Sequence, residues 1–230
     1  MRKYIPYIMV AAVAAVIIIM TKFHIGMDKV TTIGVVIVLV LFAAILEVKG
    51  LDAKSMASVA TLSAIGGAVR VPFAGILGLQ PTTFIVAVSG YALGPVDGFT
   101  VGAMSAFISN FFLGQGPWTL WQMLGWGLCG FFFGLLKKGN TKVHNIIFVV
   151  LCGLWGYIYG WILDMWYVVA YVNPINIKTV VASLTLSFLG DTLHATGNIF
   201  FAALFGKKFI TVLDRCNRRF SVEYIDGPKD

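Results

Sequence analysis

The stretch from Asn110 to Gly134, NFFLGQGPWTLWQMLGWGLCGFFFG, decides how the rest of the chain folds. The Gly-Gln-Gly-Pro sequence at residues 114–117 separates two apolar segments, which predicts a tight reversal between two helices. After this turn, Trp118, Gln122 and Trp126 recur at steps of four, so on a helix two indoles and one amide share a face. Lipid offers such a polar face no hydrogen-bond partners, so the face needs a function other than contact with lipid.

The composition places this stretch in a membrane protein. The chain has 230 residues, of which 59% are hydrophobic and 12% are charged, whereas soluble domains carry about 25% charged residues. Because a spanning helix needs about 20 mostly apolar residues, we expect an all-α integral membrane protein without a sizeable soluble domain. The net charge of +7 comes from basic residues in short connections and the tail, which is typical of membrane orientation. We therefore expect lipid, and no nucleic acid, as a partner.

The apolar segments predict an N-terminal transmembrane hairpin at residues 1–50, a six-helix core at 51–206 and a basic cytoplasmic tail at 207–230. Between the first two core helices, the segment from Arg70 to Pro81 holds two prolines and two glycines and predicts an apolar loop of the kind that covers a pocket. Phe73 and Gln80 lie in this loop. The expected helices cover residues 5–20, 31–46, 55–69, 82–93, 99–113, 118–136, 143–171 and 180–205.

Basic residues predict the orientation of these spans. With eight alternating helices, one side receives most of them, and the other receives only Lys22, Lys29, Arg70 and Lys178. Both termini are therefore expected in the cytoplasm. The loop that begins at Arg70, the turn at 114–117 and the Asn-Pro loop at 173–174 then share the outer face.

Ionisable residues recur in the last two apolar segments. Asp191, His194 and Asn198 form one stripe at spacings of three and four, and Asp164 precedes Tyr167 in the segment before. An aspartate at membrane depth costs about 2.5 to 3.5 kcal/mol, so these side chains should face the protein interior or a wet cavity. They are candidates for ligand binding, and the alternative is hydrogen bonding that holds helices together. A metal site is not expected, since the other two histidines lie near membrane surfaces.

The face of Trp118, Gln122 and Trp126 has two interpretations. Tryptophan is common at membrane interfaces, and Trp118 fits that role. An interfacial belt needs no amide one turn deeper and no indole two turns deeper, so a ligand wall is favoured. Asn110 and Gln115, on either side of the start of the turn, complete the candidate wall. For Arg70, pairing with an anionic group and snorkelling to the interface both remain open.

The segment at 55–69 is rich in small residues, among them Ala60 and Ala64 at a spacing of four. Such a face lets another helix approach closely, either inside the chain or in a partner. The sequence holds no phosphate-binding P-loop. Any ATP hydrolysis linked to this chain is therefore expected in another subunit.

From about Lys54 to Arg219 the sequence resembles the substrate-binding S components of energy-coupling factor (ECF) transporters, the prokaryotic vitamin importers. The resemblance rests on an ordered series of motifs: the alanine-rich first core helix with Arg70-Val71, then QPTTFIV (80–86), GPVDGF (94–99), SNFF (109–112), GQGPWT (114–119), WQM (121–123) and DTLHATGN (191–198).

The resemblance implies a binding subunit rather than an enzyme, in the plasma membrane of a prokaryote. Such a subunit captures a vitamin at the outer face under the loop with Arg70, Phe73 and Gln80. It then topples on a membrane scaffold subunit driven by two ATPases, and Ala60 and Ala64 match the positions that meet the scaffold. No permanently bound cofactor is implied. The GQGPW turn is similar to that of S components linked with cobalamin, which is therefore the expected vitamin.

Two other classes of function remain as alternatives. A self-sufficient facilitator or secondary transporter would need no partner, although inverted repeats are not visible. An intramembrane enzyme would use Asp164, Asp191 and His194 as acid and base, although these residues lack a recognisable catalytic frame.

Overall fold

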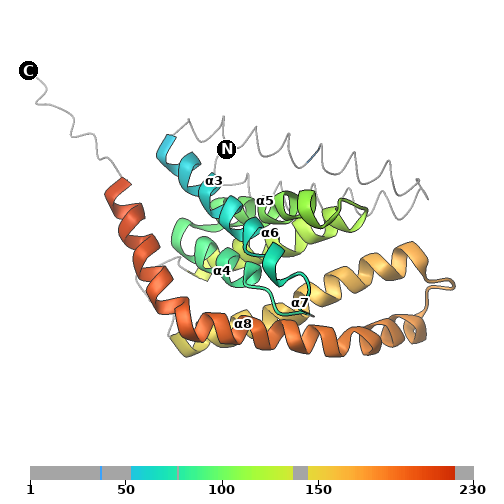
Figure 1. The fold of residues 1–230 in the computed structure, drawn as a ribbon. Coiled ribbons are helices and arrows are strands. Elements are labelled where there is room, and N and C mark those ends of the chain that lie inside the picture. The colour runs from blue at the N-terminus through green and yellow to red at the C-terminus, as the bar shows by residue number, and fades with distance from the viewer. Residues whose placement is uncertain (1–36, 38–52, 77, 137–144, 221–230) are drawn as a thin grey trace, which may run out of the picture.

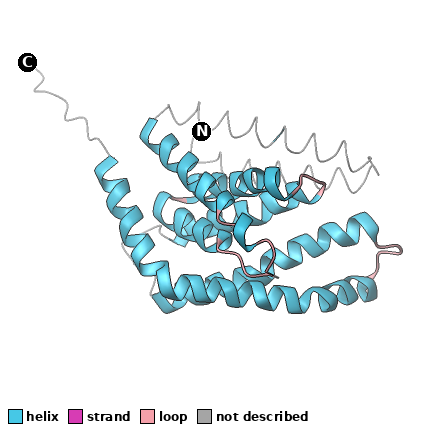
Figure 2. Cartoon of the chain, viewed as in Figure 1, coloured by secondary structure: helices cyan, strands magenta, loops and turns pink. Residues whose placement is uncertain are grey.

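The described part of the chain is built from helices. The computed structural model describes residue 37 and residues 53–76, 78–136 and 145–220. Within these ranges every regular element is helical (Figure 2). The elements are α3 (Ala53–Ala68), the 3-10 helix η2 (Val71–Phe73), α4 (Thr82–Leu93), α5 (Pro95–Leu113), α6 (Trp118–Leu136), α7 (Asn145–Tyr171) and α8 (Ile177–Phe220).

Length and composition confirm a helical membrane protein. Five of the described helices are long and apolar enough to span a membrane, and α4, with 12 residues, is shorter. A core of six spanning helices therefore stays a prediction. The predicted hairpin at residues 1–50 falls outside the described residues, apart from residue 37, so the division into hairpin, core and tail also stays a prediction.

Most helix ends lie within a few residues of the predicted ones, with two corrections. α5 begins at Pro95 rather than at residue 99, because proline suits the first helical position, where its missing N–H is not needed. α8 continues to Phe220 rather than ending at residue 205. Its 44 residues extend about 66 Å at 1.5 Å each, which exceeds the bilayer thickness of about 40–45 Å. The first part of the expected tail is therefore helical.

The helices form two groups, which are joined by α4 and by contacts between α6 and α7. α5 packs against α3 and α6, α7 pairs with α8, and α4 contacts α5 and α6 on one side and α8 on the other (Figure 1). The α5–α6 turn and the α7–α8 turn lie toward the same end of the molecule, whereas the carboxyl end of α8 lies toward the opposite end (Figure 1). This arrangement leaves the connection from α3 to α4 directly over α8.

Glycines allow α4, α5 and α6 to approach each other closely. A Cβ atom at Gly130 of α6 would collide with the backbone carbonyl of Gly98 in α5, and one at Gly90 of α4 would collide with the carbonyl of Gly130. Backbone atoms at a helix crossing have no rotamer with which to move aside. These three glycines therefore hold the central helices in register.

Replacing Gly130 by alanine is expected to lower the Tm of the detergent-purified protein by about 5 °C, because overpacking costs about 1–3 kcal/mol. Differential scanning fluorimetry measures this. Gly206→Ala in α8 is the matched control, since its nearest neighbours are Phe148 ring atoms at 3.7 Å. Equal melting temperatures for the two variants would contradict the role assigned to Gly130.

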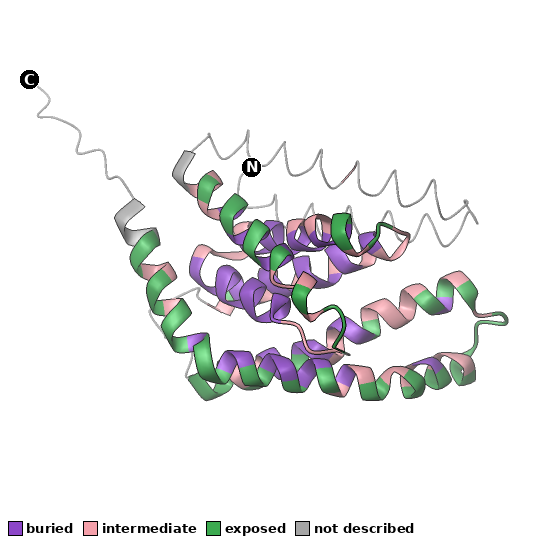
Figure 3. Ribbon diagram, viewed as in Figure 1, coloured by how far each residue is buried: buried purple, intermediate pink, exposed green. Residues whose placement is uncertain are grey.

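Exposed apolar side chains identify the surface that faces lipid. On α7 and α8 they include Ile147, Leu154, Phe188, Phe200 and Leu204, each more than half exposed. The burial map shows a buried centre in α4 to α6, flanked by exposed faces on α7 and α8 (Figure 3). So much exposed apolar surface is unusual for a soluble protein and is expected in a bilayer.

Candidate functional site

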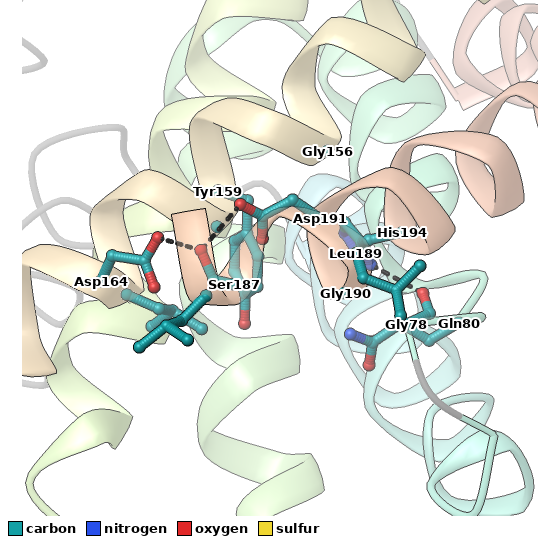
Figure 4. A pocket seen from close by; sticks show the side chains of 13 residues that line it. Gly78, Gln80, Gly156, Tyr159, Asp164, Ser187, Leu189, Gly190, Asp191 and His194 are labelled. Carbon is teal, nitrogen blue, oxygen red and sulfur yellow. Dashed lines mark hydrogen bonds between the residues drawn. The ribbon is translucent and has the colours of Figure 1, made fainter. Parts of the chain in front are cut away.

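A cavity of about 450 Å³ lies between α7, α8 and the segment just before α4. Its polar lining comes from all three elements, and Figure 4 shows the side chains around it. The volume falls within the roughly 300–1,000 Å³ of ligand pockets. The lining residues are Gly78, Gln80, Gly156, Tyr159, Gly160, Leu163, Asp164, Leu186, Ser187, Leu189, Gly190, Asp191 and His194.

Two carboxylates meet at one end of this cavity. The Ser187 hydroxyl lies 2.6 Å from Oδ2 of Asp164 and 3.3 Å from Oδ2 of Asp191. A hydroxyl carries a single proton, so it donates to one acceptor at a time. Gly160 makes room for this arrangement, because a Cβ atom at that position would collide with the Asp191 carboxylate. The sequence predicted that both aspartates face the interior or a wet cavity, and the structure places them together.

His194 connects the cavity to the core. Its Nδ1 lies 2.9 Å from the carbonyl oxygen of Gly78, and its Nε2 lies 2.9 Å from Oγ1 of Thr83. The Trp126 indole N–H donates to the same Thr83 oxygen at 2.9 Å. A neutral imidazole with its proton on Nδ1 satisfies every group in this chain, because the carbonyl only accepts and the Thr83 hydroxyl then donates to Nε2.

Gly78 brings the α3–α4 segment onto α8. Its φ of 70° lies in the left-handed region that glycine adopts readily. A Cβ atom there would lie 2.8 Å from the carbonyl oxygen of Gly190 and from the amide nitrogen of His194. Only glycine fits this position without displacement, so the segment is held directly over the cavity.

Arg70 links the same segment to α5 and α6. Its Nε donates to Oε1 of Gln80 at 3.0 Å. Its Nη1 lies 2.8 Å from Oγ of Ser109, 2.7 Å from Oδ1 of Asn110 and 3.5 Å from Oε1 of Gln122. Arg70 therefore points into the protein, and among the described residues it pairs with no anion; pairing with an anionic group of a ligand stays a prediction. Neutral oxygens hold it inside.

Aromatic rings connect Arg70 to His194. The guanidinium lies 4.9 Å from the ring centroid of Trp126, a cation–π distance. Trp126 stacks on Tyr159 with centroids 4.5 Å apart, and Tyr159 stacks on His194 at 5.3 Å. Trp126 is fully buried behind Tyr159, which lines the cavity. The predicted wall of Gln122 and Trp126 therefore forms a layer that supports the cavity lining.

Asn110 is the centre of the α5–α6 turn. Its amide nitrogen donates to Thr119 Oγ1 at 2.9 Å and to Gln122 Oε1 at 2.8 Å, and the residue is 1% exposed. Gln115 bonds the Phe107 carbonyl and the Thr119 hydroxyl. Both side chains stabilise the turn in this structure.

Four further candidates lie away from the cavity lining. Trp118 packs edge to face on Trp166, with centroids 5.9 Å apart. Tyr167, 46% exposed, packs against Tyr171. Phe73 makes an edge contact with Phe201 of α8 and so anchors the α3–α4 segment. Asn198 is fully buried, and in the described structure neither atom of its amide group has a hydrogen-bond partner. The ligand contacts of Trp118, Tyr167 and Asn198, and the role of Phe73 in a lid, stay predictions.

Sequence reasoning missed four residues that shape the site: Gly78, Thr83, Tyr159 and Ser187. Ser187 lies four residues before Asp191, so helical spacing was a signal that could have identified it. Thr83 and Tyr159 occur in ordinary apolar segments without such a signal. Among the described residues, no three His, Cys, Asp or Glu side chains come close enough to hold a metal ion.

The fold and the cavity define a multi-span helical membrane protein with a polar pocket between its helices. Residues 52–194 match the family model described as "ECF-type riboflavin transporter, S component". The chain belongs to this family of ECF S components. It is therefore a transporter subunit and not an enzyme, and the family implies association with an ECF module of scaffold and ATPases.

Relatives of this chain align with it over a stretch of similar length. A UPF0397 protein of Aliivibrio fischeri strain MJ11 is 26% identical over 173 residues, covering 68% of this chain and 87% of the relative. A UPF0397 protein of Aliivibrio salmonicida is 31% identical over 160 residues, covering 62% of this chain and 84% of the relative. No solved structure matches the chain.

Proposed function

We propose that this chain captures a vitamin from outside the cell and delivers it inward with the help of an ECF module. The observation that carries the proposal is the cavity between α7 and α8, lined by Asp164, Asp191, His194, Tyr159 and Gln80. At about 2.5 to 3.5 kcal/mol for each aspartate, a membrane protein keeps two such groups in its spans only where they serve a purpose. Holding a polar solute is that purpose here.

The segment from Arg70 to Gln80 serves as the lid in this proposal. It is tied down by Arg70 on α5 and α6, by Phe73 on α8 and by Gly78 on His194. Arg70 makes several hydrogen bonds, Phe73 makes one ring contact and Gly78 accepts one hydrogen bond, and none of these ties is a packed helix face. Breaking these few contacts opens the cavity without disturbing the helices that form its walls.

The size of the cavity bears on the identity of the vitamin. About 450 Å³ suits a compact ring system of flavin size, and the matching family model is described by riboflavin. Cobalamin, favoured by the GQGPW turn, is much larger and requires the lid to move away from α7 and α8. We therefore propose a compact vitamin for the closed cavity, with cobalamin as the alternative for an opened one.

Membrane placement follows the same proposal. The chain lies in the plasma membrane with both termini in the cytoplasm, and its ATP is consumed by partner ATPases. A scaffold subunit joins it to two such ATPases. The lid, the α5–α6 turn and the α7–α8 turn then face the outside.

Binding and uptake assays test this function. The purified chain is expected to co-purify with a small molecule that mass spectrometry identifies as a vitamin, and to bind it in a titration. In proteoliposomes, uptake is expected only when scaffold, ATPases and ATP are supplied. Uptake by the chain alone would contradict the proposal and favour a self-sufficient facilitator.

A further inference from the structure

The two carboxylates in the cavity have more acceptor capacity than the protein satisfies. The single proton of the Ser187 hydroxyl has three acceptors within reach, the Asp164 and Asp191 carboxylates and the Leu184 carbonyl, and serves one at a time. In the described ranges, no lysine or arginine side chain lies within 4.0 Å of either carboxylate, and the ring nitrogens of His194 contact Thr83 and Gly78. Each ionised carboxylate accepts several hydrogen bonds, so the pair is short of donors.

A second, separate observation concerns the tyrosine that lines the same cavity. Tyr159 is 4% exposed, and its hydroxyl has no hydrogen-bond partner within the described structure. Buried hydroxyls are nearly always hydrogen-bonded, because leaving one unsatisfied costs about 1–3 kcal/mol. Tyr159 lines the same cavity as the carboxylate pair, so a ligand there would lie against a tyrosine and two carboxylates that lack donors.

The opposite side of the cavity offers a donor. The Gln80 carbonyl oxygen accepts from Arg70, which leaves the Gln80 amide N–H groups as donors. In the close-up, Asp164 and Ser187 lie on one side of the cavity, and Gly78 and Gln80 lie on the other (Figure 4). The cavity therefore has an acceptor-rich end and a donor end.

We propose that Asp164 and Asp191 together bind an N–H-rich or cationic group of the substrate, such as an amino-substituted ring, an imide or an ammonium group. Gln80 binds a carbonyl or ring nitrogen at the other end. This inference rests on the proposed function and narrows its substrate class: the carboxylate pair rejects vitamins that carry a carboxylate and no N–H donor.

Isothermal titration of the detergent-purified chain tests the inference. The probes are thiamine and riboflavin, which carry N–H donors, cyanocobalamin, which carries amide donors, and nicotinate, an anion without an N–H donor. The wild-type chain is expected to bind at least one donor probe at least about 10-fold more tightly than nicotinate. Asp164→Asn and Asp191→Asn are each expected to weaken that binding about 10-fold or more, as for a lost hydrogen bond to a charged group.

Asp214→Asn, on the part of α8 beyond the cavity, is the matched control and should leave the affinity unchanged. A melting curve for each variant confirms that the isosteric change leaves the protein folded. If both cavity variants bind a donor probe as tightly as the wild-type chain does, the carboxylate role is overturned while the proposed function stays intact. Tighter binding of nicotinate than of every donor probe would have the same consequence. A wild-type chain that binds no probe and co-purifies with no vitamin would overturn the proposed function itself.

Discussion

Replacing Ala64 by tryptophan is expected to abolish vitamin uptake while leaving vitamin binding unchanged. In α3, Val59, Leu62 and Ser63 are buried, whereas Ala60 and Ala64 are exposed on the opposite face. An exposed stripe of alanines presents almost no side chain, so a partner helix reaches the backbone of α3 closely. An indole on that stripe holds the partner helix several ångströms away.

Two assays separate coupling from binding. Titration of the purified variant measures binding, and proteoliposomes with scaffold, ATPases and ATP measure uptake, which is expected to fall to background. Ala182→Trp adds the same indole to an exposed alanine of α8 and is expected to keep normal uptake. Normal uptake by the Ala64 variant would contradict the assignment of α3 to the scaffold, and the same reasoning applies to Ala60→Trp.

Replacing Arg70 by alanine is expected to destabilise the protein and to weaken vitamin binding about 10-fold or more. The change removes the donor that holds Ser109, Asn110 and Gln80 together. Asn110 is 1% exposed, so its Oδ1 loses its cationic partner where water cannot readily replace it. A hydrogen bond to a charged group contributes about 1.5–3 kcal/mol, which corresponds to roughly 5–10 °C in Tm for a chain of this size.

Arg70→Lys distinguishes charge from geometry. Lysine keeps the positive charge but lacks the planar fork that contacts Gln80 on one side and Asn110 on the other. We expect it to recover part of the Tm and little of the binding. Lys178→Ala, which removes an exposed cation at the start of α8, should change neither quantity. Wild-type affinity in the Arg70→Ala variant would show that the lid closes without this residue.

Local periodicity predicted much of the fold. The helices at 82–93 and 118–136 begin and end where the apolar segments do. The prediction that the Asn110–Gly134 stretch forms a turn followed by a polar helical face is confirmed. Its interpretation as a ligand wall is not tested, and the structure adds that Trp126 is covered by Tyr159 of α7. Neither the sequence around Trp126 nor the sequence around Tyr159 indicates this contact.

The stripe of Asp191, His194 and Asn198 shows, within one helix, both what the local sequence predicts and what the tertiary structure adds. The spacing predicts that the three side chains share a face, yet their surroundings differ. Asp191 meets Asp164 through Ser187, His194 bonds Gly78 and Thr83, and Asn198 is buried without a partner among the described residues. Helical spacing determines the face, and neighbouring helices determine what each residue on that face contacts.

The sequence by itself determined the membrane class, the approximate ends of the described helices and the family, because hydrophobicity, turn residues and ordered motifs are local properties of the chain. Only the tertiary structure decided which polar groups meet. Arg70 reaches Asn110 across 40 residues, and Asp164 reaches Ser187 across 23. Such contacts depend on the register between helices, which the close approach at Gly130 and similar packing determine collectively.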